Sequence, residues 1–307
     1  MAKKSSFDSL PREIRTALYR VDEPETFEVA RNRTDSITVF NKRISRVYKY
    51  VRKNKKNVAA LEKEIDNLIR LRDKKIAAPT PLNRMPLKGY DSVVLGYVDG
   101  EILVNNVLPK HIAALGESLK KIHSAFEKEG KNKLADWSST RVLKPYFAKA
   151  NADDFGVEVI AFARSLVKSL REHELNREDM TFVHADSQLS NVVFDANRAV
   201  LIDWAQAGFG SKFFDLGVGI HALLFEKKVL QRDLLRAYIG AYFGEAGPTE
   251  RDIELIDLHV KLRFLESATW HLQLSKEDQL LGRTRILKFI DESFRKAQKF
   301  SIVAATK

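Results

Sequence analysis

The sequence has no cysteine among its 307 residues. This absence excludes disulfides, thiolate nucleophiles and zinc sites built on cysteine, so any bound metal must be held by oxygen or imidazole ligands. No apolar run approaches the length of about 18 residues that a membrane-spanning helix needs. The opening stretch MAKKSSFDSLPREIR also lacks the apolar centre of a secretory signal. We therefore expect no membrane span and a protein that remains in the cytoplasm.

Acidic residues are fewer than basic ones, with 41 Asp and Glu against 52 Lys and Arg, which gives a net charge of +11. This excess favours anionic partners such as nucleotides, nucleic acid, anionic lipid or acidic polysaccharide, and selects none of them. Repeats and low-complexity segments are absent, and the hydrophobic content of 44% is ordinary for a globular protein. A chain of this length predicts one bilobal unit or two closely packed domains.

The N-terminal part has the pattern of β-strands. Three stretches rich in β-branched and aromatic residues, TFEVARN, SITVFN and ISRVYKYVRK, are separated by the turn-like RTD and NKR, and predict a three-stranded antiparallel meander. The segment NVAALEKEIDNLIRLRDKK follows with leucines at helical spacing, and the proline-containing AAPTPLNRMP ends it. The stretch DSVVLGYVDGEIL predicts one more buried strand.

Beyond Pro109 the pattern becomes mainly helical. We expect helices near residues 109–129, 140–150, 156–174, 213–225, 230–244, 250–274 and 280–300. Short strands interrupt them in TFVH, NVVFD and AVLID, of which the last two are expected to form a hairpin. The order predicts an α+β fold with a small β-rich domain, residues 1–100, and a larger helical domain, residues 101–307.

Three polar side chains lie at the ends of the short apolar runs between residues 181 and 208, namely Asp186, Asn191 and Asp203. Phosphoryl transfer needs a carboxylate that orients the attacking hydroxyl and accepts its proton, and oxygen ligands for magnesium. Asp186 can supply the carboxylate, while Asn191 and Asp203, at the two ends of the hairpin, can converge on one ion. The structural alternative is that Asp186 and Asn191 form turns and Asp203 caps the segment after it.

The motif HADSQLSN followed by LIDW resembles the phosphotransfer motifs of the aminoglycoside phosphotransferase and choline kinase family, which is related to protein kinases. The segments LGESLKKIHS and GFGSKFFDLG are similar to two further parts of that family. The resemblance implies a protein-kinase-like bilobal fold and ATP, or GTP, as phosphoryl donor. It also implies that Asp186 is the catalytic base and that Asn191 and Asp203 bind Mg²⁺.

Two further residues match the motifs of the family. His184 matches the motif histidine, and Asp215 matches the aspartate of an Asp-Leu pair. The resemblance implies that both support the catalytic loop structurally. The loop departs from the family at Ser187, where an apolar residue is common.

A kinase fold requires a lysine on the third strand that contacts phosphates and pairs with a glutamate on the next helix. Lys49 shares a strand face with Val47 and Val51, and Glu64 is the candidate partner. Lys53 on the same face, and Glu62 as a second glutamate, stay open as alternatives, as does a solvated Lys49 on an edge strand.

No glycine occurs between Glu25 and Ser45, whereas protein kinases cover the phosphates with a glycine-rich loop. The segment NRTDS can instead form a short hairpin in which Ser36 and backbone amides contact phosphate. The stretch VVLGYVDGEIL resembles the hinge of the family, which implies that the main chain of Gly96, Tyr97 and Val98 contacts the adenine.

The phosphoryl acceptor should bind among the C-terminal helices. Glu266 and Trp270, at i and i+4 on one helix face, can line a pocket for a cationic acceptor. The alternative is a buried tryptophan with an exposed glutamate beside it. The basic segment, Asn41 to Lys56, has eight Lys or Arg and no acid, which suits RNA, a protein or an acidic polysaccharide such as lipopolysaccharide, or simply a solvated face.

Three interpretations follow from the sequence. The first is a magnesium-dependent kinase that acts on a hydroxyl of a small molecule of aminoglycoside, amino-alcohol or sugar type. The second has the same chemistry on a large anionic acceptor. The third is a non-catalytic module that binds nucleotide or RNA.

Overall fold

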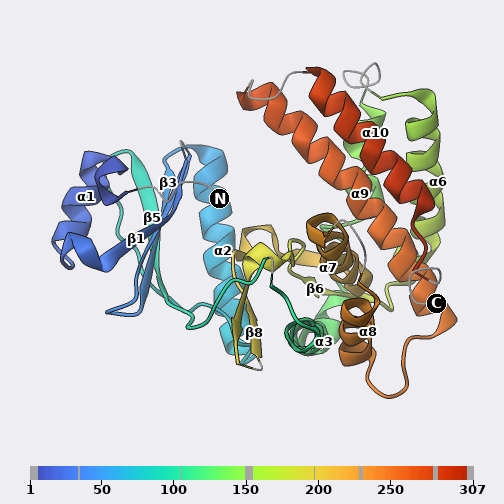
Figure 1. Cartoon of the computed structure of the whole chain (residues 1–307), viewed down its shortest axis with the longest axis horizontal. Helices are drawn as coiled ribbons and strands as arrows, with labels where there is room; N and C mark the ends of the chain where they lie inside the picture. The colour runs from blue at the N-terminus through green and yellow to red at the C-terminus, as the bar shows by residue number, and fades with distance from the viewer. Residues whose placement is uncertain are drawn as a thin grey trace. The chain divides into compact units, whose positions relative to one another are not determined.

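The computed structural model describes residues 6–33, 35–104, 106–148, 155–196, 198–227, 231–278 and 283–302. The chain divides into two compact units (Figure 1). The first comprises Met1–Glu101 and Val200–Gln206, and the second comprises Ile102–Ala199 and Ala207–Lys307. The short segment Val200–Gln206 therefore packs with the N-terminal residues, although it is far from them in the sequence.

The first unit is built on one antiparallel sheet with the strand order β1-β2-β3-β5-β4. The strands are β1 (Phe27–Asn32), β2 (Ser36–Asn41), β3 (Arg46–Arg52), β4 (Pro81–Asn83) and β5 (Tyr90–Gly96). Two helices, α1 (Arg12–Tyr19) and α2 (Lys55–Asp73), accompany the sheet, together with the 3₁₀ turns η1 (Phe7–Ser9), η2 (Pro24–Thr26) and η5 (Trp204–Gln206). Figure 1 shows α1 and α2 on opposite sides of the sheet.

The side chains of β3 alternate between the two faces of this sheet, as the period of two in a strand requires. Tyr48 and Tyr50 are buried in the cluster that contains Leu10, Ile14 and Leu18 of the α1 region. Lys49 therefore points to the other face, which α2 covers. The alternation fixes which residues of the sheet can reach the helix α2.

The predicted elements of the first unit are confirmed in β1 to β3, α2 and β5. Two elements were not predicted, namely α1 and β4. The signal for α1 was present, because Pro11 precedes the helix and Ile14, Ala17 and Leu18 are buried at helical spacing. β4 has only three residues, and it pairs irregularly with β5 at the edge of the sheet.

The second unit is mainly helical. Its helices are α3 (Pro109–Gly130), α4 (Ser139–Val142), α5 (Lys144–Phe147), α6 (Val157–Asn176), α7 (Lys212–Lys227), α8 (Arg232–Phe243), α9 (Glu250–Asp278) and α10 (Arg283–Lys299). β6 (Met180–Val183) pairs antiparallel with β9 (Gly208–Ser211), and β7 (Val192–Asp195) pairs with β8 (Arg198–Leu201). The 3₁₀ turn η4 (Leu189–Asn191) precedes β7.

The α+β class and the kinase-like order of elements are confirmed, and so is the hairpin of β7 and β8. The single helix expected over residues 140–150 is wrong: the structure has two short helices, α4 and α5, separated at Leu143. Pro145 explains the break, because proline is favoured in the first turn of a helix and cannot donate a backbone hydrogen bond. β9 was not predicted, since its sequence GFGS has two glycines and only one aromatic residue.

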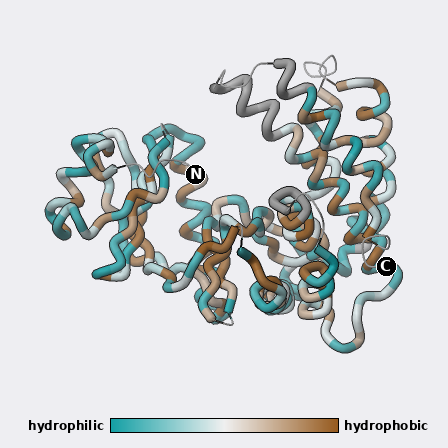
Figure 2. The backbone as a smooth tube through the Cα atoms, viewed as in Figure 1, coloured by the Kyte–Doolittle hydropathy of each residue, from teal (hydrophilic) through white to brown (hydrophobic). Residues whose placement is uncertain are grey.

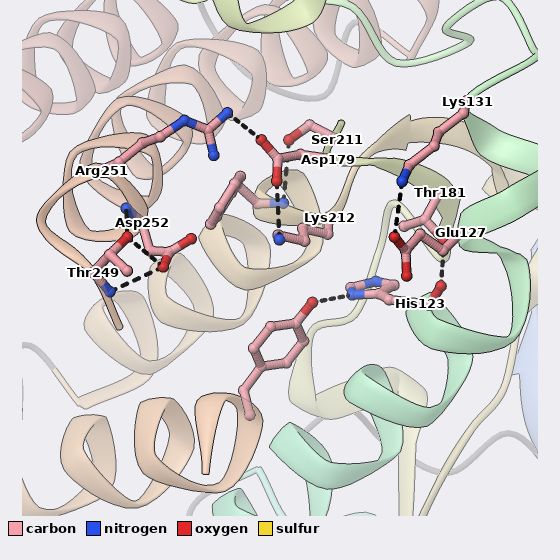
Figure 3. A network of polar contacts seen from close by, with 12 residues as sticks. His123, Glu127, Lys131, Asp179, Thr181, Ser211, Lys212, Thr249, Arg251 and Asp252 are labelled. Atoms are coloured by element: carbon pink, nitrogen blue, oxygen red, sulfur yellow. Dashed lines mark hydrogen bonds and ion pairs between the residues drawn. The ribbon is translucent and has the colours of Figure 1, made fainter. Parts of the chain in front are cut away.

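An ion-pair network joins three elements of the second unit (Figure 3). Asp179, directly before β6, contacts Lys212 at 2.9 Å and Arg251 at 2.6 Å. Burial alone would raise the pKa of the Asp179 carboxyl, but the hydrogen bonds from Arg251 and Lys212 outweigh it and lower that pKa. The carboxylate thus holds the starts of α7 and α9 beside β6.

Among the described residues, no helix is long and apolar enough to cross a membrane. Figure 2 shows hydrophilic stretches beside hydrophobic ones along α6, α9 and α10, as expected for helices with one face in the core.

Gly130, the last residue of α3, lies against the backbone of β6. A Cβ atom at this position would be 2.1 Å from the carbonyl oxygen of Met180 and 2.7 Å from the Cα of Thr181. Gly240, inside α8, has no atom within 4 Å of the corresponding position. The two glycines therefore differ in the space around them, although both lie in helices of the same unit.

We expect Gly130→Ala to reduce the free energy of unfolding by about 1–3 kcal/mol or more, because backbone atoms must move to admit the methyl group. Gly240→Ala should instead increase it by about 0.5–1 kcal/mol, since alanine is the better helix former and nothing obstructs it. Chemical denaturation of both variants and the parent protein measures the two effects. Equal effects of the same sign would contradict the packing of α3 on β6.

Candidate active site

Lys49 lies in the first unit between two carboxylates. Its Nζ is 2.6 Å from Oε2 of Glu64 on α2 and 2.8 Å from Oδ1 of Asp203. Burial lowers the pKa of Lys49, but the charges of Glu64 and Asp203 outweigh it and raise the pKa from 10.5 to about 12. Lys49 is therefore fully charged at neutral pH. The structure pairs it with Glu64 rather than with Glu62.

Asp203 follows β8 in a strained backbone conformation. Its φ of +64° lies in the left-handed region, which costs an aspartate roughly 1 kcal/mol or more. The segment after it is fixed to α2, because the side chain of Asn67 donates to the carbonyl of Trp204 at 2.9 Å. The Trp204 indole, fully buried, donates to the carbonyl of Leu201 at 2.9 Å. These contacts hold the Asp203 carboxylate toward Lys49.

The proposed hinge residues lie at the end of β5 and directly after it. They differ in the hydrogen bonds that their main-chain groups already make. The N–H of Gly96 donates to the carbonyl of Thr80 at 2.8 Å, and the N–H of Tyr97 donates to the carbonyl of Ser45 at 3.1 Å. The backbone of Val98 makes no hydrogen bond within the described part of the chain. Val98 is therefore the residue whose N–H and carbonyl are available to a base.

Ser36 opens β2. Its hydroxyl donates weakly to the Asp35 carboxylate at 3.4 Å, and its carbonyl accepts a hydrogen bond from the N–H of Arg33 at 2.9 Å. Thr34, between them, lies outside the described residues. The role of the Ser36 hydroxyl in phosphate binding stays a prediction.

In the second unit, Asp186 follows β6 and opens the loop that ends in η4. Its Oδ2 accepts hydrogen bonds from the side-chain nitrogens of Asn191 at 2.7 Å and Gln188 at 3.2 Å. Its backbone N–H donates to Nδ1 of His184 at 3.2 Å, which makes that ring nitrogen an acceptor. His184 has no exposed surface.

Asp215, on α7, holds the backbone of this loop. Its carboxylate accepts from the N–H groups of His184 at 2.8 Å and Ala185 at 2.7 Å, and its carbonyl accepts from the Ser187 hydroxyl at 3.0 Å. Ala185 has a φ of +66°, so a residue with a Cβ is held in the left-handed region. The loop that carries Asp186 is thus fixed by a buried charge.

His123, on α3, contacts Asp215 as well, and Figure 3 shows it beside Thr181. Its Nε2 is 3.1 Å from Asp215, and its Nδ1 is 2.8 Å from the hydroxyl of Tyr242 on α8. The Thr181 hydroxyl of β6 donates to the carbonyl of His123 at 2.7 Å. With Nε2 donating to the carboxylate, Nδ1 accepts from Tyr242, so one tautomer satisfies both bonds. The sequence analysis gave His123 no role, although it lies in the segment LGESLKKIHS, which resembles the family.

The carboxamide of Asn191 fits the role of an oxygen ligand. Its nitrogen donates to the carbonyl and to Oδ2 of Asp186, at 2.9 and 2.7 Å, and its Oδ1 accepts no hydrogen bond within the described part of the chain. Magnesium prefers oxygen ligands, and commonly binds through one or two protein groups together with substrate phosphates. No group of three or more His, Asp or Glu side chains suited to hold a metal occurs among the described residues. The free amide oxygen of Asn191 therefore fits a magnesium ion that binds together with nucleotide phosphates.

Arg263, on α9, is a second residue that the sequence analysis did not identify. One terminal nitrogen is 3.3 Å from Oδ1 of Asp186, and the other is paired with Glu266. Its Nε is buried and has no hydrogen-bond partner among the described residues. Glu266 is therefore already bound to a cation of the chain, and the side chain of Trp270 lies outside the described residues.

Three of the eight cations of the basic segment lie beside carboxylates. Lys42 contacts Glu28 at 3.8 Å, Arg43 is paired with Asp22, and Lys49 is buried between its two carboxylates. The charge of these residues is offset inside the first unit.

Solved structures of kinases share this fold. The chain is 14% identical to an amicoumacin kinase in complex with AMP-PNP, Ca²⁺ and Ami, with a TM-score of 0.70 and coverage of 94% of this chain and 96% of that one. It is 16% identical to a choline/ethanolamine kinase family protein from Mesorhizobium loti, with a TM-score of 0.62 and coverage of 91% and 90%. A GDP complex of aminoglycoside 2'-phosphotransferase-IIIa is 14% identical, with a TM-score of 0.67 and coverage of 94% and 97%.

A search of curated proteins finds no match to the chain. The family model of the phosphotransferase enzyme family matches residues 40–253. That match spans both the strand that carries Lys49 and the loop that carries Asp186. As the motifs around Asp186 and Asp203 predicted, the chain belongs to the phosphotransferase enzyme family.

Proposed function

We propose that this protein transfers the γ-phosphoryl group of ATP to a hydroxyl group of a small molecule. The observation that carries the proposal is the contact of Lys49 with both Glu64 and Asp203, because this arrangement is what a phosphate-binding lysine of a kinase requires. A solvated lysine on an edge strand would have neither partner. The non-catalytic interpretation is weaker, since it gives no reason to bury this charge.

Asp186 is the proposed catalytic base. Its Oδ2 is held by Asn191 and Gln188, which leaves the carboxylate oriented to accept the proton of an acceptor hydroxyl. Asn191 and Asp203 supply oxygen ligands for magnesium, which would neutralise charge on the phosphates when bound. Lys49 contacts the phosphates, and His184 and Asp215 position the loop.

The nucleotide is proposed to bind through the main chain after β5, where Val98 is available, with contributions from Gly96 and Tyr97. Main-chain contacts do not by themselves choose between adenine and guanine. One similar structure is a complex with AMP-PNP, and another is a complex with GDP. We propose ATP as donor, with GTP as the alternative.

A small acceptor is favoured over a nucleic acid or another large polyanion. Three of the eight cations of the basic segment, Lys42, Arg43 and Lys49, are paired with carboxylates of the first unit. The similar structures include complexes with small molecules, namely Ami in one and kanamycin in another. The acceptor is proposed to be an aminoglycoside-, amino-alcohol- or sugar-like alcohol that approaches Asp186 next to Arg263 and Glu266.

We expect Asp186→Asn to lower kcat for phosphoryl transfer by about 10²- to 10⁴-fold, the usual contribution of a general base. The assay measures ADP release and labelled product with ATP, magnesium and a panel of alcohols. Asp195→Asn is the matched control, because Asp195 lies on β7 in the same hairpin and only forms an exposed pair with Arg198. Transfer by Asp186→Asn at the parent rate would show that this carboxylate is not the base.

Glu266→Gln should lower kcat for neutral and cationic acceptors alike. Arg263 would lose one of its two carboxylates and contact Asp186 more closely, where it competes with the acceptor hydroxyl. The control is Glu254→Gln, an exposed glutamate on the same helix. The measurement compares kcat and KM for an amine-bearing alcohol and a neutral sugar. A rise of KM for the amine alone would instead make Glu266 a direct ligand of a cationic acceptor.

A further inference from the structure

An irregularity in β1 determines where Arg31 points. Val29 lies opposite Val39 of β2, but Arg31 rather than Ala30 lies opposite Thr38. Ala30 is therefore an extra residue, which makes this a β-bulge. Bulges turn the side chains after them to the other face of the sheet and are frequent next to active sites.

The pairing of β1, β2 and β3 places Arg31 in line with Lys49. Thr38, opposite Arg31, is in turn opposite Lys49 of β3. Directly opposite residues of antiparallel strands point to the same face, so Arg31 and Lys49 share a face. The next residue confirms the orientation, because Asn32 points the other way and its side chain donates to Ser9 of η1 at 3.1 Å.

Without the bulge the same sequence would place the small side chain of Ala30 on the Lys49 face. Arg31 would then face the hydrophobic cluster of Tyr48, Tyr50 and the α1 region, where burial of a guanidinium is costly. The bulge thus exchanges a methyl group for a guanidinium beside Lys49.

Arg31 is loosely held in this position. One of its terminal nitrogens is 3.8 Å from Oδ2 of Asp203, too far for a hydrogen bond, and no other polar contact of its side chain occurs in the described residues. Its side chain is 40% exposed, whereas that of Lys49 is 13% exposed. The five N–H donors of the guanidinium are therefore available to a ligand.

Lys49 alone does not supply the positive charge that a nucleotide needs on this face of the sheet. Lys49 has two carboxylates within 2.8 Å, so its charge is already compensated by Glu64 and Asp203. A nucleoside triphosphate carries more negative charge than one magnesium ion neutralises. A further cation on the same face is thus required, and guanidinium groups match phosphate oxygens in a bidentate geometry.

We infer that Arg31 binds the terminal phosphates of the nucleotide, and so takes over the contact that backbone amides of a glycine-rich loop make in protein kinases. The inference rests on the proposed function, since it deepens the description of the same nucleotide site. It accounts for a β1–β2 segment without glycine: a long side chain reaches the phosphates, so the backbone need not approach them closely.

Titration of the full-length protein with ATP, AMP and adenosine in the presence of magnesium tests the inference. Arg31→Ala should weaken ATP binding about 10- to 100-fold, the loss expected for charge-assisted hydrogen bonds, and leave AMP and adenosine within about twofold of the parent. Arg31→Lys should recover part of the affinity for ATP, because it restores the charge without the bidentate geometry.

Arg20→Ala is the matched control. Arg20 caps the end of α1, so its replacement removes the same charge from the same unit. Its side chain makes no hydrogen bond or ion pair with the described residues. Its variant should bind all three ligands as the parent does. Thermal unfolding of each variant verifies that the fold is retained, and a surface contact as long as that of Arg31 should contribute less than about 1 kcal/mol.

The outcomes separate this inference from the proposed function. If the parent binds ATP and Arg31→Ala binds it within twofold, or if adenosine weakens as much as ATP, the role of Arg31 is wrong and the proposed kinase activity stands. If the parent binds neither ATP nor GTP with magnesium, the proposed function and the role of Arg31 both fail.

Discussion

Asp215 is fully buried on α7, and its carboxylate accepts hydrogen bonds from His184, Ala185 and His123. A buried carboxylate without such donors would cost several kcal/mol, so the charge and the donors require one another. The two N–H groups come from adjacent residues, which is possible only if the backbone turns sharply, and Ala185 adopts the left-handed conformation that provides the turn. The direction in which the Asp186 side chain points is set by the hydrogen bonds of this one carboxylate.

The first unit also buries a charged group, but here the group is a cation. Lys49 is a buried ammonium, and Glu64 and Asp203 together compensate the cost of removing it from water. Asp203 also has a left-handed backbone, held by the burial of Trp204 and by the bond from Asn67. In each unit, therefore, one charged group fixes a strained residue whose conformation the local sequence does not favour. Backbone strain of this kind occurs most often at functional sites.

Much of the fold and site could be predicted because the determining signals are local. Alternation along β3 placed Lys49 on the correct face, and the spacing of HADSQLSN placed Asp186 and Asn191 on one loop. The sequence did not predict that Arg31 faces Lys49, because a β-bulge shifts the register without a sequence signal of its own. The roles of His123 and Arg263 were not predicted for another reason. His123 contacts Asp215 and Arg263 contacts Asp186 from helices that are distant in the sequence, so tertiary packing decides these pairs.

For Glu266, helix periodicity does not determine which side chain is its partner. The spacing i, i+4 placed Glu266 and Trp270 on one face, but i, i+3 places Arg263 and Glu266 side by side just as well. In the structure the shorter spacing forms the ion pair, and the other terminal nitrogen of Arg263 reaches Asp186. The proposed catalytic base, Asp186, therefore already has a cationic neighbour. Arg263 would repel an acceptor that carries an ammonium group close to the reacting hydroxyl, so the proposed role of Asp186 predicts alcohols whose amino groups, if any, lie away from that hydroxyl.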